Sequence, residues 1–236
     1  MRTSVIIPAL NEEASLPFVL AELPWSRVHQ VIVVDNGSRD RTAEVAAAGG
    51  AVVVYEPRRG YGAACMAGVH AAAEAEILVF LDGDGSFDAT EIPRLVSPIE
   101  AGEAELVLGS RLKGEREPGA MPLHGLVGNW LVARMIRQLA GIPLTDLGPY
   151  RAITRRALVQ LGMEELTYGW PSEMIVKAVQ LGMPIREIPV RYRQRHGGAS
   201  KVSGTWHGTL GATYRIFRVI YKYARHRRGA WGGGQR

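Results

Sequence analysis

The sequence predicts an α/β protein in which a mixed, mostly parallel sheet lies between helices. Two observations carry this prediction. Short apolar runs rich in β-branched residues recur along the first half of the chain, and stretches with helical periodicity separate them. The 236 residues, 47% hydrophobic and 22% charged, are enough for a sizeable core in one large domain. Crossovers between such strands bring their carboxyl ends to one edge of the sheet.

Five apolar runs are expected to form buried strands in the first half of the chain. They are Thr3–Pro8, Gln30–Val34, Ala51–Tyr55, Ile77–Leu81 and Ala104–Leu108. Helices are expected between them at Glu13–Leu23, from Asp40 to Ala48, at Gly60–Ala75 and at Glu91–Ala101. Asp40 suits a helix N-cap, the Gly-Gly pair at 49–50 suits the end of that helix, and Pro24 ends the first one.

The pattern is looser after Ser110. Helices are expected at Met121–Leu139 and at about Ser172–Leu181, strands at Tyr150–Ile153 and Ile185–Tyr192, a polar loop at Arg193–Gly204 and a long helix at Thr205–Arg225. We therefore divide the chain into a main domain at 1–204, an amphipathic helix at 205–226 and a flexible Gly-rich tail at 227–236.

Charge is distributed unevenly along the chain. The net charge is +5, yet residues 186–236 contain 12 Lys and Arg against the single acid Glu187. A basic C-terminal fifth predicts an anionic partner such as phosphate, nucleic acid or a membrane surface. The sequence shows no signal peptide and no apolar run of about 18 residues, and its single cysteine fits a reducing compartment. We therefore expect a cytoplasmic protein.

The Asp-Gly-Asp sequence at 82–84 follows the fourth expected strand. Carboxylates separated by glycine can approach Mg²⁺ or Mn²⁺ together with the phosphates that share the metal. An isolated copy is more often a polar turn, but its position at a strand end favours the functional interpretation. Asp35, also at a strand end, suits either a hydrogen bond to a base or ribose, or an Asx-turn.

The glycine-rich phosphate motifs of two common enzyme classes are missing. The first strand is not followed by Gly-x-Gly-x-x-Gly, and the chain contains no Walker A sequence. Dehydrogenases and P-loop ATPases are therefore disfavoured.

A set of short motifs resembles family 2 glycosyltransferases of the GT-A fold, above all the polyprenyl-phosphate (dolichyl-phosphate) mannose and glucose synthase branch. The motifs are VIIPALNEE at 5–13, VVDNGSRDRT at 33–42, RGYGAA at 59–64, FLDGDG at 80–85, GSR at 109–111 and RHGGASK at 195–201. The resemblance implies metal-dependent transfer of a hexose, with inversion, from a nucleoside diphosphate sugar such as GDP-mannose or UDP-glucose. The implied acceptor is a polyprenyl phosphate.

The resemblance also implies roles for individual residues. The base and ribose pocket would consist of Pro8, Ala9, Asn11, Glu12 and Asp35, with Arg59 and Gly60 beside the nucleotide. Asp84 would ligate Mg²⁺ or Mn²⁺, Asp82 would contact ribose or metal, and Ser86 would be a weak ligand where some relatives have Gln. Arg111, Arg195 and Lys201 would neutralise phosphate, and Ser200 belongs to the same Gly-rich loop as the last two.

Glu173 lies near the position where many inverting relatives carry an acidic Glu-Asp base motif, but no Asp follows it here. A phosphate acceptor is ionised near neutral pH, whereas an alcohol acceptor needs a base to remove its proton. The missing Asp therefore favours a phosphate acceptor. Two alternatives stay open: the same donor chemistry on a soluble or lipid alcohol with Glu173 as base, and a non-catalytic nucleotide-sugar-binding subunit. No recognisable motif supports nucleic-acid binding, so we expect no nucleic-acid partner.

The expected helix Thr205–Arg225 is amphipathic, with aromatic and aliphatic residues on one side and Arg and Lys on the other. This pattern suits a helix packed on its own domain. It equally suits peripheral attachment to the inner face of a membrane, where the basic residues would contact anionic headgroups.

Overall fold

A computed structural model describes residues 1–140, 144–197 and 222 of the chain. The strands are β1 (Thr3–Ala9), β2 (Gln30–Asp35), β3 (Val52–Tyr55), β4 (Ile77–Phe80), β5 (Leu106–Ser110), β6 (Arg151–Thr154) and β7 (Ile185–Pro189). The helices are α1 (Leu16–Glu22), α2 (Thr42–Ala48), α3 (Tyr61–Ala71), α4 (Ile92–Glu100), α5 (Leu123–Ala140), α6 (Arg155–Leu161) and α7 (Trp170–Gln180), with 3-10 turns η1 (Trp25–Arg27) and η2 (Ala89–Glu91).

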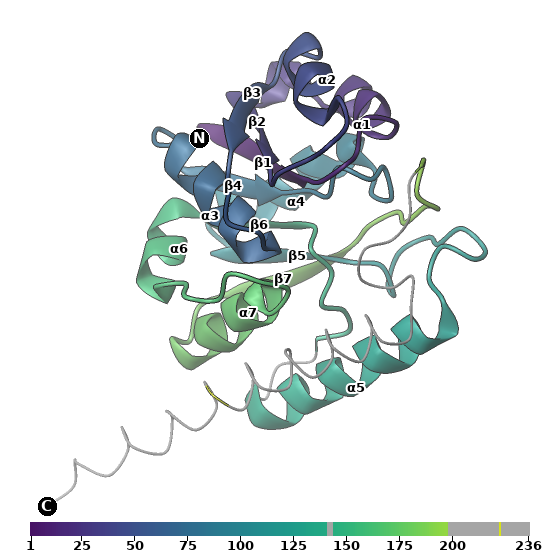
Figure 1. The fold of residues 1–236 in the computed structure, drawn as a ribbon. Coiled ribbons are helices and arrows are strands. Elements are labelled where there is room, and N and C mark those ends of the chain that lie inside the picture. Colours follow the sequence, from purple (N-terminus) through teal and green to yellow (C-terminus); the bar gives the residue numbers. More distant parts are fainter. Residues whose placement is uncertain (141–143, 198–221, 223–236) are drawn as a thin grey trace, which may run out of the picture.

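The described strands form a seven-stranded sheet in the order β3-β2-β1-β4-β6-β5-β7 (Figure 1). β1 pairs in parallel with both β2 and β4. The chain adds β2 and β3 on one side of β1 and then β4 on its other side, so the strand order reverses between β1 and β4. β6 pairs antiparallel with β4 and β5, and β5 pairs in parallel with β7. The predicted mixed, mostly parallel sheet is confirmed. In open α/β sheets ligands bind where the strand order reverses, which here is at the carboxyl ends of β1 and β4.

Helices cover both faces of the sheet. Ile6 and Phe80 belong to a core cluster with α3, α6 and α7 on one face, whereas Val5 and Val79 belong to a cluster with α1, α2 and α4 on the other. Neighbouring residues of one strand thus enter different clusters, as the period of a strand requires. This is why the strands read as continuous apolar runs in the sequence rather than as alternating ones.

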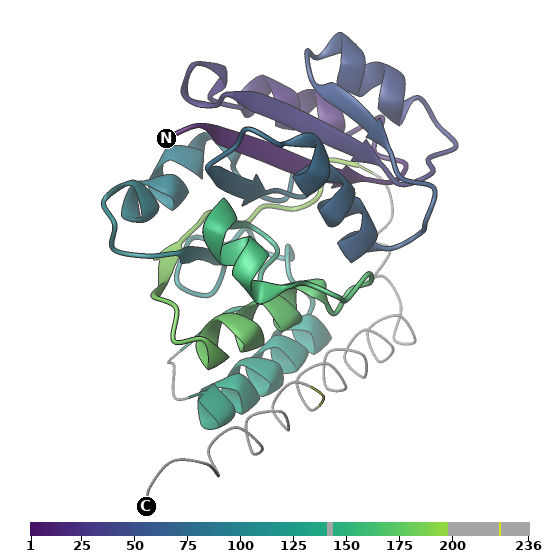
Figure 2. The same cartoon turned by 90° about the vertical axis from the view of Figure 1, so that its left-hand side faces the viewer.

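Helix α5 lies against α7, on the side of the molecule away from α1 and α2 (Figures 1 and 2). It exposes Val127, Trp130 and Leu131, and the Arg134 guanidinium lies 5.8 Å from the centre of the Trp130 ring. The spacing of these four residues places them on one side of the helix. Within the described ranges, no helix has both the length and the apolarity to cross a membrane.

Some elements differ from those expected. The sequence pattern does not predict α6, a short helix capped by the Thr154 hydroxyl, which accepts the Ala157 N–H. β7 ends at Pro189, and Tyr192 makes only isolated bridges. α1 begins at Leu16 rather than Glu13, because residues 12–15 form a turn of their own. The expected helix Thr205–Arg225, apart from Lys222, and the boundary at 204 lie outside the described residues.

Candidate active site

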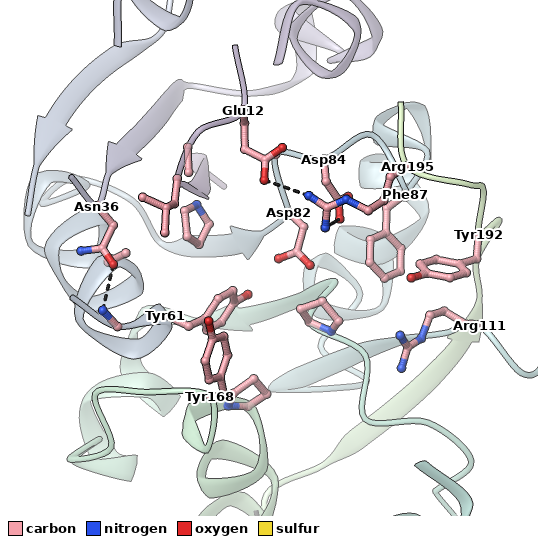
Figure 3. A pocket seen from close by; sticks show the side chains of 18 of the residues that line it. Glu12, Asn36, Tyr61, Asp82, Asp84, Phe87, Arg111, Tyr168, Tyr192 and Arg195 are labelled. Carbon is pink, nitrogen blue, oxygen red and sulfur yellow. Dashed lines mark hydrogen bonds and ion pairs between the residues drawn. The ribbon is translucent and has the colours of Figure 1, made fainter. Parts of the chain in front are cut away.

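A pocket of about 970 Å³ opens at the carboxyl ends of β1 and β4, where the strand order reverses (Figure 3). Its lining includes nine residues expected from the sequence, namely Pro8, Ala9, Glu12, Arg59, Gly60, Asp82, Asp84, Arg111 and Arg195. It also includes Asn36, Tyr61, Phe87, Thr167, Tyr168 and Tyr192, which the sequence analysis did not single out. Segments from both ends of the described chain therefore meet in one pocket.

Asp84 is oriented by Ser86. Its Oδ1 accepts hydrogen bonds from the Ser86 backbone N–H at 2.9 Å and from the Ser86 hydroxyl at 2.6 Å. Ser86 is buried and does not line the pocket. The short Ser86 side chain thus turns back to the carboxylate two residues earlier, and ligation of a metal by Ser86 stays a prediction. Ser86 fixes one oxygen of Asp84 and leaves Oδ2 for other partners.

Asp82 and Asp84 are neighbouring carboxylates on the pocket wall. Burial, and then the charge of Asp84, raises the pKa of Asp82 to about 7, because both disfavour its ionised form. A divalent cation would favour that form. No cluster of three or more His, Cys, Asp or Glu occurs among residues 1–140, 144–197 and 222 that could enclose a metal. The two carboxylates therefore fit Mg²⁺ or Mn²⁺ that completes its ligand shell on a diphosphate.

Arg195 bridges Glu12 and Asp84 (Figure 3). Its Nη2 lies 2.9 Å from Glu12 Oε1, and its Nη1 lies 2.8 Å from Asp84 Oδ2. The Ser15 hydroxyl donates to the other Glu12 oxygen at 2.8 Å. The Arg195 side chain is 25% exposed, and its buried Nε has no hydrogen-bond partner among the described residues. Arg195, which was expected to contact phosphate, is therefore paired with two carboxylates, and its Nε–H is available to another acceptor.

Arg111 is paired with Asp146, a residue that the sequence analysis did not identify. The Asp146 carboxylate is fully buried, and its Oδ1 lies 2.7 Å from Nη2 of Arg111. Burial opposes ionisation of both groups, but their mutual attraction lowers the pKa of Asp146 below its usual value and raises that of Arg111. The pair therefore stays ionised over the whole physiological pH range. A lone Asp in a loop gives no sequence signal of such a role.

Asp35 and Asn11, both expected to bind base or ribose, do not line the pocket. Asp35 Oδ1 accepts the Ser38 N–H at 2.7 Å, which is the Asx-turn alternative for this residue. Asn11 Oδ1 accepts the Arg39 N–H at 2.8 Å. Both side chains shape the turn after β2, and contact with a nucleotide stays a prediction for them.

Asn36 lines the pocket instead and organises the segment that leads to α3. Its amide nitrogen donates to the carbonyl oxygens of Glu56 and Arg58, and its side-chain oxygen accepts the Gly60 N–H at 2.8 Å (Figure 3). Gly60 has φ +146°, and a Cβ there would lie 2.2 Å from the Leu166 carbonyl oxygen. Only glycine fits this approach. Asn36 follows an expected strand and lies in the VVDNGSRDRT motif, and these two sequence signals could have identified it.

Glu173 lies in the first turn of α7 but does not line the pocket. Its fully buried carboxylate accepts backbone N–H groups of residues 164–165 at 3.0 and 2.8 Å and pairs with Lys177 Nζ at 2.8 Å. The structure does not bring Glu173 to the pocket wall, and its role as a base stays a prediction. Its carboxylate holds the loop that carries residues 167–168 to the pocket wall.

Ser200 and Lys201 lie outside the described residues, and their roles stay predictions. Tyr61, Tyr168 and Tyr192 reach the pocket from three different segments (Figure 3). Tyr61 lies in the RGYGAA motif, which could have identified it, whereas Tyr168 and Tyr192 have no local pattern that distinguishes a pocket residue from a core residue.

The sequence is similar to those of known glycosyltransferases. The family described as Glycosyl transferase family 2 matches residues 4–162. An uncharacterised glycosyltransferase of Mycobacterium tuberculosis is 42% identical over 219 residues, which cover 92% of this chain and 97% of the relative. An undecaprenyl-phosphate mannosyltransferase of Micrococcus luteus is 34% identical, with 86% of this chain and 88% of the relative covered. A polyprenol monophosphomannose synthase of Mycolicibacterium smegmatis is 31% identical, with 86% and 82% covered.

A solved structure shows the same fold. Glucosyl-3-phosphoglycerate synthase from Mycobacterium tuberculosis, in complex with Mn²⁺, UDP-glucose and phosphoglyceric acid, superposes with a TM-score of 0.78 at 26% sequence identity. The match covers 95% of this chain and 80% of the other. That relative therefore binds a divalent metal, a nucleotide sugar and a phosphorylated acid on a similar framework.

Proposed function

The chain belongs to glycosyltransferase family 2, and we propose that it transfers a hexose from a nucleoside diphosphate sugar to a phosphate oxygen of a polyprenyl phosphate, with inversion. The observation that carries the proposal is the convergence of Asp82 and Asp84 with Arg59, Arg111 and Arg195 in one pocket. Paired carboxylates suit a metal-bound diphosphate, and guanidinium groups on the pocket wall suit its remaining charge.

Departure of the diphosphate is the step that these residues would assist. The acceptor oxygen forms its bond to the anomeric carbon as the bond from that carbon to the diphosphate breaks, and the negative charge moves onto the leaving group. Asp82 and Asp84 would hold Mg²⁺ or Mn²⁺, which supplies positive charge to the leaving diphosphate when bound. Arg195 can donate its N–H groups to the same oxygens, because it already lies at Asp84.

The position of Glu173 supports an acceptor that is already ionised. Its carboxylate is occupied by backbone N–H groups and Lys177 and does not line the pocket. An alcohol would require a base in reach of its proton, whereas a phosphate oxygen attacks without one. Arg111, which lines the pocket, can attract such an anion. The undecaprenyl-phosphate mannosyltransferase reported above, whose name includes a polyprenyl phosphate, supports the same class.

A soluble phosphorylated acid is the second candidate acceptor. The solved relative that binds phosphoglyceric acid covers 95% of this chain, so the framework is compatible with a small acceptor as well. Phosphoglyceric acid also has a free hydroxyl group, and transfer to that oxygen would need a base, whereas transfer to a phosphate oxygen would not. The two candidates share a negative charge and differ in the length and apolarity of the acceptor and in the oxygen that attacks.

A substrate panel tests the proposal. UDP-glucose and GDP-mannose, each with Mn²⁺, Mg²⁺ or EDTA, are incubated with undecaprenyl phosphate, undecaprenol or 3-phosphoglycerate, and hexose transfer is measured. We expect metal-dependent transfer to undecaprenyl phosphate and none to undecaprenol. Transfer to 3-phosphoglycerate alone would replace the first candidate by the second. Transfer to the alcohol, or donor binding without any turnover, would contradict the proposal.

Helix α5 supports a membrane surface as partner. Its exposed Val127, Trp130 and Leu131, with Arg134 beside them, combine apolar contact area with positive charge. Such a side can lie at the boundary between headgroups and acyl chains and bring the pocket to a lipid acceptor. Co-sedimentation with vesicles should require anionic lipid and weaken with salt and in Trp130→Ala. Equal binding to neutral vesicles would contradict the peripheral attachment.

A further inference from the structure

The segment before β6 is fixed to its surroundings by side chains from two distant elements. Glu187 on β7 accepts the backbone N–H groups of Thr145 at 2.8 Å and of Asp146 at 3.0 Å. Asn129 on α5 donates to the Thr145 carbonyl at 3.2 Å and accepts the Leu147 N–H at 3.1 Å. The backbone on both sides of Asp146 is therefore held in place.

Asp146 uses this fixed position to grip Arg111. Its Oδ2 accepts the Arg111 backbone N–H at 2.7 Å and the Nε–H at 2.8 Å, and its Oδ1 accepts from Nη2 at 2.7 Å. The carboxylate is fully buried, and the Arg111 side chain is 16% exposed. Two parallel bonds to one carboxylate fix both the place and the plane of a guanidinium. The centre of the Tyr192 ring lies 5.2 Å from the central carbon of the guanidinium, and the ring limits the movement of that group further.

Arg111 keeps donors for the pocket despite this grip. A guanidinium has five N–H groups, and the bonds to Asp146 use those on Nε and one on Nη2. Arg111 lines the pocket, whereas Asp146 does not. The opposite edge of the guanidinium is therefore the part available to a substrate oxygen.

Arg151 provides a contrast inside the same molecule. It is fully buried, donates to the carbonyl oxygens of Gly148 and Pro171, and does not line the pocket. Arg151, whose role is structural, thus donates its hydrogen bonds to backbone carbonyl oxygens rather than to a carboxylate. A buried ion pair contributes little net stability compared with apolar side chains of similar size, so stability alone does not explain a dedicated carboxylate for Arg111.

We propose that Asp146 is a positioning residue that holds Arg111 in the orientation in which it binds an anionic oxygen of the substrate. Glu187 supports this arrangement by fixing the backbone of Asp146, and Lys113 offsets the charge of Glu187 at 2.8 Å. The inference rests on the proposed function only in taking the ligand of Arg111 to be a phosphate group.

A double-mutant cycle on phosphate binding tests the inference. Wild type, Arg111→Met, Asp146→Asn and the double variant are titrated with inorganic pyrophosphate by calorimetry, with thermal unfolding as the control for folding. We expect each single variant to bind about tenfold more weakly. Asp146→Asn should have no further effect once Arg111 is removed, because it acts through that residue. Glu105→Gln, which breaks the surface ion pair with Arg156, is the matched control and should bind as wild type.

Each other outcome overturns the inference. Equal effects of Asp146→Asn with and without Arg111 would show that Asp146 acts by another route, and normal binding by Arg111→Met would remove its premise. If Asp146→Asn does not fold, Asp146→Glu keeps the charge but displaces the guanidinium. It should also weaken binding, and wild-type affinity would overturn the inference. Hexose transfer is measured separately, so a failed substrate panel with an intact cycle would contradict the proposed function alone.

Discussion

Arg111 and Arg195 face the same pocket but are held in different ways. The partner of Arg111 is Asp146, which is fully buried and does not line the pocket. The Asp146 carboxylate accepts two parallel hydrogen bonds from the Arg111 guanidinium. The partners of Arg195 are Glu12 and Asp84, which both line the pocket. One arginine has a dedicated carboxylate, and the other shares carboxylates that a ligand can reach.

The two arginines therefore differ in how ligand binding affects them: Arg111 keeps its carboxylate partner, whereas Arg195 can exchange one of its partners for a ligand. When a metal binds Asp84, Arg195 loses one of its two partners, and a diphosphate oxygen can replace that partner. Arg111 loses nothing on ligand binding, because its carboxylate is inaccessible to the ligand. We therefore expect Arg195 to change partners during the reaction cycle and Arg111 to stay in place.

Stability provides the largest expected contrast between the two arginines. Arg111→Met leaves Asp146 as a buried, unpaired carboxylate, and we expect it to lower the free energy of unfolding by about 3–5 kcal/mol. Arg195→Met leaves carboxylates at a pocket open to water, and the expected loss is about 1 kcal/mol. Urea denaturation of both variants measures the difference. Equal losses would show that the two arginines are not held differently.

Metal affinity tests whether Arg195 is exchangeable. Arg195 occupies Asp84 Oδ2 and must leave it when a metal binds, so Arg195→Met should bind Mn²⁺ about five- to tenfold more tightly without nucleotide. Arg59→Met is the matched control, because Arg59 lines the same pocket but donates to the Gly37 carbonyl oxygen. Electron paramagnetic resonance of free Mn²⁺ measures both. Unchanged affinity in Arg195→Met would show that Arg195 does not compete with the metal.

The pH dependence of metal binding is a smaller effect. With its pKa raised to about 7 by burial and Asp84, Asp82 holds a proton in the metal-free protein at lower pH, and the metal must displace it. Mn²⁺ affinity should therefore increase between about pH 6 and about pH 8, by at most about tenfold per unit below the pKa. Asp82→Asn should make the profile flatter. A flat profile in the wild type would contradict this assignment.

The fold was predictable where the signal was local. β2 and β4 follow the apolar runs expected for them, because strands buried on both faces leave continuous β-branched sequence. The reversal of strand order and the antiparallel β6 depend on pairing between distant segments, which no local pattern encodes. The sequence analysis also missed the short α6, because two turns of helix are too short to show a helical periodicity in the sequence.

The site divides along the same line. Asp82 and Asp84 were predictable because they follow an apolar strand and form a motif. Asp146 was not, because its partner is 35 positions away in the sequence and its own loop contains no motif. Glu173 shows the converse: its position relative to a family motif suggested a base, and no local pattern indicates that its carboxylate accepts the N–H groups of residues 164–165.

The smallest expected effect is that of Glu173→Gln on transfer. The substitution weakens the hold on the loop next to the pocket, but removes no group that touches the substrates. Activity per folded molecule should fall less than about threefold, whereas loss of a general base costs about 10²–10⁴-fold. The pH profile of kcat should keep its shape. A large loss of kcat in well-folded protein would restore Glu173 as a base.

The central claim is that Asp84 holds a divalent metal against the diphosphate of the donor. The most direct test compares wild type with Asp84→Ala. The rate at which each releases nucleoside diphosphate from UDP-glucose and from GDP-mannose is measured with Mn²⁺ and with EDTA, and circular dichroism verifies the folding of both. We expect the wild type to turn over at least one donor and to stop in EDTA, and we expect Asp84→Ala to lose at least about 100-fold in rate. Near-wild-type turnover by Asp84→Ala, or full wild-type activity in EDTA, would contradict the claim.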